Sequence, residues 1–410
     1  MKSIESKIPK FFDILEEEVE KTNFIQNVFK NFAKKNGFSE MKTTMIELRE
    51  RYLNATNVHY SKIFEVHRVK EHTKYALQAD LAMSMSRFVA DLPQKSPLKL
   101  IQAGTVFRDR IPNVSGYRRE FQQILIGAWG IHSLFVDAEI LSIVWLGLNR
   151  FKDIETKFIQ ITNHNIFNCI EPNLAEKIRF NDNGISILEQ SNINQNDQQI
   201  LTELFQIERI TIENLKTYLP NIKNQLIQVE FSKILEITNY LRVLIPSCPI
   251  YFSLKDLHGT GHYSSLNYQV FIKDCHTTEH YPIADGGRID DLCSKINKND
   301  VPGTCMGIGL TRLSELLSAT RANNRIIVLI DDKEDLAYYH SKIEEIRKNL
   351  NQYLLSIIPL KRKKWKQVFN NKFYDQCNFI LLERNNMKVR SFSDDFQKKI
   401  EELLQSIHRL

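Results

Sequence analysis

Cysteine is scarce in this 410-residue sequence, and none of the six cysteines stands in a CxxC pair. Isolated cysteines are typical of reduced, buried thiols, which argues against a disulfide framework and against a zinc site. No stretch reaches the roughly 18 uninterrupted apolar residues that a membrane-spanning helix needs. The first ten residues, MKSIESKIPK, also lack the apolar core of a signal peptide. We therefore expect a cytoplasmic protein with no bound metal and no membrane partner.

A strong excess of one charge is also missing, since the net charge is only +6 at pH 7. A balance this mild permits contact with nucleic acid without requiring it. The one dense basic run is KRKKWK, from Lys361 to Lys366, in which Trp365 is interleaved. This run indicates either the polar start of a helix or a tryptophan that stacks on a nucleic-acid base.

The length of the chain predicts two or three domains, because one hydrophobic core rarely grows beyond about 250–300 residues. Apolar residues at helical spacing predict a helix that includes Phe24 to Phe32 and ends at Gly37. The same spacing predicts a buried helix from Phe135 to Leu148. Between residues 165 and 246, an Asn- and Gln-rich stretch precedes further helical spacing, which predicts a mostly helical insertion.

The rest of the chain contains strand patterns. Residues 250–272 alternate apolar and polar side chains around glycines, which predicts strands joined by a tight turn. Strand patterns at 325–331, 353–358 and 378–382 alternate with helical ones. This alternation predicts a small α/β domain at the end of the chain.

Three motifs follow one another along the chain, at residues 103–130, 285–290 and 306–313. The first, AGTVFRDRIPNVSGYRREFQQILIGAWG, resembles motif 2 of class II aminoacyl-tRNA synthetases. The second, DGGRID, resembles the GGRYD signature of the histidyl type, and the third, MGIGLTRL, resembles motif 3. Residues 37–47 resemble motif 1, although Thr44 stands where that motif has proline.

This resemblance implies an α+β fold with a class II synthetase-like core over residues 1–320. In that core an antiparallel sheet is flanked by helices, and the helical insertion occupies residues 165–246. Residues 325–410 resemble a shortened anticodon-binding domain. Because motif 1 builds the dimer interface in this family, the resemblance also implies a homodimer.

In the family, one arginine from motif 2 and one from motif 3 bind the ATP phosphates, and a motif 2 acid reads the adenine. Arg108 and Arg312 occupy the arginine positions. The family's FRxER becomes FRDR here, so either the glutamate is deleted or Asp109 stands one position early. A structural alternative is that the arginines form ion pairs with Asp80, Glu120 or Asp290. The glycines assigned to the cleft are Gly286, Gly287, Gly307 and Gly309.

The resemblance also implies an amino-acid pocket. Asp80 ends a LQAD run like the family's LRAD, whose acid holds the α-amino group; alternatively, Asp80 only caps the following helix. His258 occupies the place of an arginine that supports adenylation. Tyr263 matches a tyrosine that walls the side-chain pocket, or is a half-buried strand residue. The predicted amino-acid site comprises Asp80, Arg108, Gln123, His258 and Tyr263.

The runs at 77–80, 103–107 and 119–123 resemble most the histidyl-tRNA synthetase-like regulatory subunit of ATP phosphoribosyltransferase, which acts in histidine biosynthesis. We predict a regulatory subunit that binds histidine or a similar amino acid, requires no cofactor and has a short-form catalytic subunit as partner. The alternative is a histidyl-like ligase that uses ATP and Mg²⁺ to adenylate an amino acid and transfers it to tRNA or another amine. A third interpretation is a scaffold dimer with an empty cleft.

Overall fold

The structure, a computed structural model, divides into two compact units, residues 1–318 and 319–410. The residues that the structure describes are 8–55, 63–67, 73–93, 96–109, 118–181, 184–257, 263–274, 279–318, 325–331, 336–350, 353–370, 377–383, 386–390, 397–398 and 400–402. Each unit has its own sheet and its own hydrophobic clusters.

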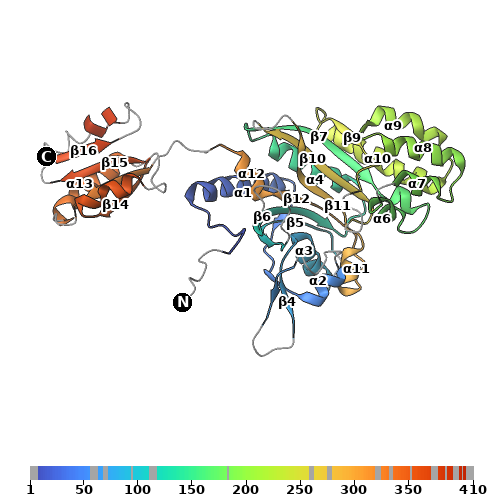
Figure 1. The fold of residues 1–410 in the computed structure, drawn as a ribbon, viewed down its shortest axis with the longest axis horizontal. Helices are drawn as coiled ribbons and strands as arrows, with labels where there is room; N and C mark the ends of the chain where they lie inside the picture. Colours follow the sequence, from blue (N-terminus) through green and yellow to red (C-terminus); the bar gives the residue numbers. More distant parts are fainter. Residues whose placement is uncertain are drawn as a thin grey trace. The chain divides into compact units, whose positions relative to one another are not determined.

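The first unit is built on a nine-stranded sheet (Figure 1). Neighbouring strands are antiparallel except for two parallel pairs, β1 with β5 and β7 with β9. The prediction of an α+β fold with a largely antiparallel sheet flanked by helices is therefore confirmed. In spatial order the strands are β1 (Ser39–Glu40), β5 (Leu98–Phe107), β6 (Glu120–Trp129), β12 (Gly303–Gly309), β11 (Tyr281–Arg288), β10 (Leu266–Asp274), β7 (Ile154–Asn163), β9 (Ile250–Phe252) and β8 (Ile210–Thr211).

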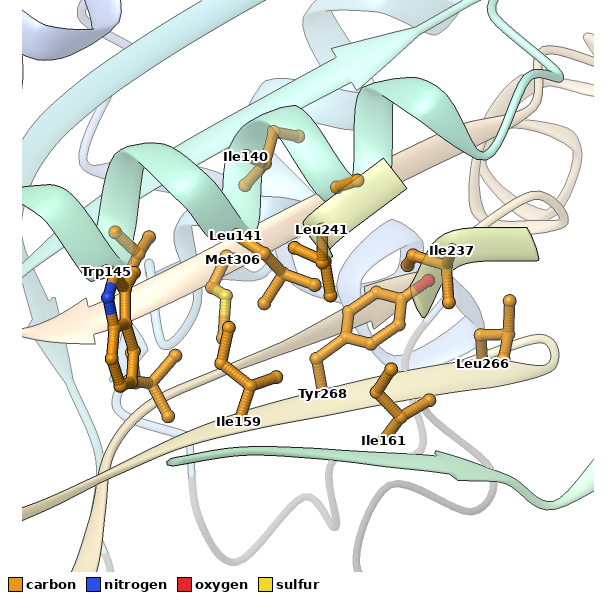
Figure 2. Packing of buried hydrophobic residues seen from close by; sticks show 14 of the residues in the cluster. Ile140, Leu141, Trp145, Ile159, Ile161, Ile237, Leu241, Leu266, Tyr268 and Met306 are labelled. Atoms are coloured by element: carbon orange, nitrogen blue, oxygen red, sulfur yellow. The ribbon is translucent and has the colours of Figure 1, made fainter. Parts of the chain in front are cut away.

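One face of this sheet is covered by α1 (Glu16–Lys35), α4 (Phe135–Leu148) and α10 (Gln225–Leu244). Helix α4 contacts both the sheet and α10, so almost all of its side chains are buried. Figure 2 shows Leu141 and Trp145 of α4 packed with Ile159 of β7, Tyr268 of β10 and Leu241 of α10. An apolar helix of this kind is stable only when it is enclosed on both sides.

The other face of the sheet carries α3 (Leu81–Ala90), with α2 (Arg49–Ala55) and α11 (Leu292–Asn297) beside it. A small sheet in the order β2 (Ile46–Leu48), β4 (Tyr75–Leu77), β3 (Glu65–Val66) leads into α3. Successive side chains of a strand point to opposite faces. On β6, Ile124 and Ile126 therefore join the cluster under α4, while Leu125 and Trp129 join the cluster under α3.

The segment between β7 and β9 is mostly helical and packs against the first face. Its elements are α5 (Asn165–Asn168), α6 (Leu174–Arg179), α7 (Gly184–Glu189), α8 (Gln195–Gln206), β8, α9 (Ile212–Tyr218), η2 (Leu219–Asn221) and α10. Glu230 of α10 is buried and accepts hydrogen bonds from the amides of Asn163 and Asn165 and from Lys233. These bonds fix α10 to the end of β7, because a buried carboxylate without partners would be costly.

The predicted tight turn between residues 250 and 272 is wrong. Strands β9 and β10 do not pair with each other, because they lie on opposite sides of β7. Their alternating sequences identified two strands but carried no information on which strand each one pairs with.

The second unit has a four-stranded sheet in the order β14 (Leu354–Pro359), β13 (Arg325–Ile330), β15 (Asn378–Glu383), β16 (Asn386–Arg390). Only the β15–β16 pair is antiparallel. Its helical segments in the described ranges include α13 (Leu336–Asn349), η3 (Arg362–Lys364) and α14 (Trp365–Phe369).

The basic run lies on η3 and α14, and its lysines are exposed. The side chain of Trp365 is only 4% exposed, and its indole N–H donates to the carbonyl oxygen of Leu360 over 2.8 Å. The hypothesis that this tryptophan stacks on a nucleic-acid base is therefore wrong, because its ring is part of a hydrophobic cluster. Among the helices in the described part of the chain, none has the length and apolar character needed to cross a membrane.

Candidate ligand site on the central sheet

The candidate site lies on the α3 side of the central sheet, where strands β6, β12 and β11 run side by side. Gln123 on β6 is opposite Gly309 on β12, and Gly307 is opposite Asp285 on β11. Residues opposite each other in antiparallel strands have their side chains on the same face. We call this surface of Gln123, Asp285, Gly287, Gly307 and Gly309 the sheet floor.

Glycine permits close approach of other groups at two positions of the sheet floor. A Cβ atom on Gly307 would lie 2.6 Å from the side-chain nitrogen of Gln123, and one on Gly287 would lie 2.8 Å from the ring of Tyr263. Gln123 and Tyr263 therefore lie directly on the floor. Gly309 is more open, with no atom nearer than 3.8 Å to its Cβ position. Gly286, also assigned to the cleft, points to the opposite face, where a Cβ would meet the backbone of Cys305 and Met306.

Asp80 and Arg108 lie together beside this floor, and Asp80 has two sets of contacts. Its Oδ1 accepts from the backbone N–H groups of Ala82 at 2.6 Å and Met83 at 3.2 Å, so it caps α3. Its Oδ2 is 3.8 Å from a terminal nitrogen of Arg108. The two structural alternatives, a helix cap and an ion pair with Arg108, therefore occur at once.

Arg108 follows the last residue of β5, and three groups hold it. Its Nε donates to the carbonyl oxygen of Ala79 over 2.8 Å, and its guanidinium lies 5.4 Å from the ring centre of Phe121. About a third of the side chain, 37%, is still exposed. The guanidinium is therefore oriented by the protein and remains accessible to an anion.

Tyr263 lies on the sheet floor, near enough to Asp80 to feel its charge. Its hydroxyl donates to Oδ2 of Asp285 over 3.1 Å. Burial raises the pKa of Tyr263, and the nearby carboxylates of Asp285 and Asp80 raise it further, so the phenol stays protonated. Gln123 adds an amide whose Oε1 is buried and has no hydrogen-bond partner among the described residues. His258, the remaining residue of the predicted pocket, lies outside the described residues.

Arg312 is on α12 (Leu310–Leu316), which begins where β12 ends. Its side chain is exposed, and its guanidinium lies 4.3 Å from the ring centre of Tyr281. Of the acids proposed as ion partners for these two arginines, only Asp80 pairs with either of them within the described ranges, namely with Arg108. Asp290 pairs with Arg288 instead, over 3.6 Å. Asp109 forms an ion pair with Arg119 over 3.0 Å.

Two residues near the site were not predicted. Asp285 lies within the DGGRID run, two positions before Gly287, and this spacing is a signal that both share one face of a strand. Arg118 forms ion pairs with Glu18 of α1 at 2.8 Å and with Glu315 of α12 at 2.7 Å. It ties the start of β6 to the helix that carries Arg312, and no local sequence pattern indicates such a long-range link.

The end of β11 is anchored behind the sheet by Arg288. This side chain is 4% exposed, and it donates to the buried carboxylate of Asp137 and to the carbonyl oxygens of Ile131, His132 and Ser133. The hydroxyl of Tyr268 also donates to Asp137, over 2.9 Å. Burial raises the pKa of Asp137, and the charge of Arg288 acts against that rise. This fully enclosed pair fixes β11 to the start of α4.

Beside the floor, the site offers a carboxylate at Asp80 and an accessible guanidinium at Arg108. On the floor it offers the amide oxygen of Gln123, which has no partner among the described residues. Opposite charges held a few ångströms apart complement a small zwitterion such as an amino acid. Within the described ranges, no three His, Cys, Asp or Glu side chains are placed to hold a metal ion together.

Comparison with known proteins also indicates a class II synthetase-like core. The histidyl-tRNA synthetase family matches residues 10–313, which is most of the chain. The protein therefore belongs to the histidyl-tRNA synthetase family.

The similar proteins include several histidine-tRNA ligases and two solved structures. The histidine-tRNA ligase of Clostridium acetobutylicum is 27% identical over 330 residues, which cover 75% of each chain. That of Sulfurisphaera tokodaii is 26% identical over 361 residues, 82% of each chain. A Bacillus halodurans structure, described as an ATP phosphoribosyltransferase regulatory subunit/histidyl-tRNA synthetase, superposes with a TM-score of 0.69 at 17% identity and covers 88% of this chain and 94% of its own. The histidyl-tRNA synthetase structure from a Nostoc species superposes with a TM-score of 0.67 at 18% identity. The superposition covers 97% of this chain and 99% of that one.

Proposed function

We propose that the sheet floor binds histidine or a similar amino acid, and that the chain is a regulatory subunit of ATP phosphoribosyltransferase. The observation that carries this proposal is the pair of Asp80 and Arg108 beside the floor. The ammonium group of the ligand replaces Arg108 as the partner of Asp80, and the carboxylate of the ligand takes Arg108. Both charges of the protein are thus paired before and after binding, which limits the cost of desolvation.

We propose a regulatory role, and not adenylation of the bound amino acid, because of the residues on the nucleotide side of the cleft. Asp109 is the only acid close to the motif 2 glutamate position, and its carboxylate is engaged by Arg119. A carboxylate that is already paired with an arginine is a poor hydrogen-bond acceptor for the amino group of adenine. His258 stands where adenylation calls for an arginine. Catalysis needs interactions that strengthen in the transition state, and these changes remove two of them.

Calorimetry with L-histidine tests the binding site. Asp80→Ala removes both the charge and the helix cap, whereas Asp80→Asn removes the charge and keeps a good cap. We expect both variants to bind L-histidine at least about tenfold more weakly, a loss of about 1.4 kcal/mol. Only Asp80→Ala should lose stability, by about 0.5–2 kcal/mol. Unchanged affinity in Asp80→Asn would remove Asp80 from the site, and no binding of any amino acid would favour the scaffold interpretation.

Regulation is tested with a short-form ATP phosphoribosyltransferase catalytic subunit from the same genome. The full chain should change the rate of that subunit when the two are mixed, and L-histidine should change the rate again. The Asp80→Asn variant should form the same complex but lose the response to L-histidine. A catalytic subunit that ignores the chain in every mixture would contradict the regulatory role.

The second candidate function is an ATP-dependent ligase, and one observation favours it. Arg312 is exposed, forms no ion pair within the described part of the chain and stacks on Tyr281, so it is available to a phosphate. The sequence relatives described above are also named histidine-tRNA ligases. We expect no histidine-dependent pyrophosphate exchange from the isolated chain with ATP and Mg²⁺. Robust exchange that Arg312→Ala abolishes would replace the regulatory proposal with a ligase acting on tRNA or another amine.

A further inference from the structure

The sheet floor carries a carboxylate, that of Asp285, in addition to the ion pair of Asp80 and Arg108 beside it. Asp285 lies on β11, opposite Gly307 of β12 on one side and opposite Gln269 of β10 on the other. Residues opposite each other in antiparallel strands have their side chains on the same face. The Asp285 side chain is therefore on the floor, and because it is partly exposed a bound molecule can reach it.

Asp285 and Asp80 lie near the same part of the floor. The hydroxyl of Tyr263 donates to Asp285 over 3.1 Å, and the charge of Asp80 also acts on this phenol. Cys305, two residues before Gly307 on β12, is a second point of contact with both charges. Burial raises the pKa of the Cys305 thiol, and the carboxylates of Asp80 and Asp285 raise it further. A ligand whose ammonium group is held at Asp80 can therefore extend its side chain toward Asp285.

The floor between Gln123 and Asp285 is flat, because the residue between them on β12 is Gly307. The amide nitrogen of Gln123 lies 2.6 Å from the position of a Cβ atom on Gly307, so this amide leans over the glycine. Neighbouring strands are about 4.7–4.9 Å apart. A ligand side chain beside this glycine is therefore about one strand spacing from Asp285 and is close to the Gln123 amide.

Two amides on this part of the floor give an independent sign of an occupant. Gln269 is only 9% exposed, and its side-chain amide makes no hydrogen bond to a described residue. The Oε1 atom of Gln123 is likewise buried without a partner in the described ranges. Buried polar groups in folded proteins are nearly always hydrogen-bonded. An occupant that brings N–H groups to this part of the floor satisfies both amide oxygens.

We infer that Asp285 selects the side chain of the bound amino acid, and that this side chain is basic. The inference rests on the proposed function, because the ammonium and carboxylate groups of the ligand stay at Asp80 and Arg108. The side chain passes Gly307 and donates an N–H to the carboxylate of Asp285. A carboxylate accepts about four hydrogen bonds, so the bond from Tyr263 and bonds from other groups of the protein are compatible with this contact. A hydrogen bond from an ionised donor is about twice as strong as one between neutral groups, which favours a basic side chain over an amide or a hydroxyl.

Calorimetry of the full chain with three amino acids tests the inference. L-histidine is compared with β-(2-thienyl)-L-alanine, whose ring is of similar size but has no N–H group, and with L-glutamine, whose side-chain N–H groups are uncharged. We expect the wild-type chain to bind L-histidine at least about tenfold more tightly than either, a difference of about 1.4 kcal/mol. Asp285→Asn keeps the shape of the side chain and should weaken L-histidine binding about tenfold, while thienylalanine binding stays unchanged. A control variant, Glu155→Gln, removes an exposed acid of β7 in the same sheet and should leave all three affinities unchanged.

The possible results separate this inference from the proposed function. Asp80→Asn should weaken L-histidine and thienylalanine by the same factor, because it acts on the ammonium group that both ligands share. If Asp285→Asn has no effect, or weakens both ligands equally, Asp285 does not select the side chain. If the wild-type chain binds thienylalanine or L-glutamine as tightly as L-histidine, selection for a basic side chain is refuted, and this comparison needs no variant to fold. In each of these cases the amino-acid site stands, whereas failure of all three ligands to bind would refute the amino-acid site itself.

Discussion

Replacing Arg288 with methionine should destabilise the first unit severely. The guanidinium of Arg288 is the only cation in contact with Asp137 in the described structure, and the Asp137 side chain is fully buried. Methionine keeps most of the volume of the arginine stem but leaves the carboxylate without its charge partner. Removing one partner of a buried ion pair costs about 3–5 kcal/mol. At about 2 °C per kcal/mol for a domain of this size, the Tm should fall by about 6–10 °C.

The loss should depend on pH in a defined direction. Burial already raises the pKa of Asp137 above its ordinary value of 3.8, and removing Arg288 raises it further. Between the ordinary and the raised pKa, the folded protein holds a proton that the unfolded chain releases. Stability therefore falls as pH rises through this window. The variant should be closest to the wild-type protein at the acid end of the window and furthest from it at neutral pH.

The assay is urea and thermal unfolding followed by tryptophan fluorescence, in which Trp129 and Trp145 report on the first unit. Arg242→Met is the matched control, because it breaks an exposed arginine–glutamate pair that contributes at most about 1 kcal/mol. The double variant Arg288→Met/Asp137→Leu should recover much of the lost stability, since no buried charge remains. A loss below about 1 kcal/mol in Arg288→Met, or one that does not change with pH, would refute this reasoning.

Three further predictions address other parts of the molecule. In Gly307→Ala, the new methyl group displaces the amide of Gln123, so L-histidine should bind about tenfold more weakly while the Tm changes little; unchanged affinity would show that this amide does not contact the ligand. Met45, Ile46 and Leu48 are exposed apolar residues around β2, so we expect a homodimer in sedimentation experiments that Ile46→Glu dissociates; a monomeric wild-type chain would contradict this. Trp365→Ala should destabilise the second unit by about 3–5 kcal/mol in urea unfolding, whereas an exposed control, Lys363→Ala, should not; equal effects would place the indole at the surface.

The sequence predicted those elements whose pattern is local. Helix α4 has the predicted bounds, Phe135–Leu148, because a long apolar run between polar segments admits few alternatives. Strands β13, β14 and β15 likewise fall within a residue or two of their predicted positions. The pairing of β9 and β10 was not predicted correctly, because partner choice depends on contacts distant in sequence. Strand β16 was missed, and its five residues NMKVR alternate too briefly to stand out.

For the candidate site, motif spacing placed Gln123 and Tyr263 on strands and loops that the structure brings to one floor. Motifs could not indicate how the charged groups are paired. Asp80 contacts both the α3 backbone and Arg108, and Asp109 contacts Arg119. Such pairings depend on rotamers and on distances of one or two ångströms. The sequence therefore predicted which charged residues belong to the site. Which of them pair with each other could be seen only in the folded chain.

The pairing of β5 with β6 limits where this chain can gain or lose a residue. The two strands stay in register over ten residue pairs, from Leu98 with Trp129 to Phe107 with Glu120. A slip of one residue would move Ile124 and Ile126 out of the core and turn Gln123 away from the floor. If FRDR has lost a residue relative to FRxER, that residue is lost between Phe107 and Glu120, outside the paired strands. A change in the number of residues between the two strands therefore leaves the strand pairs that carry the floor in place.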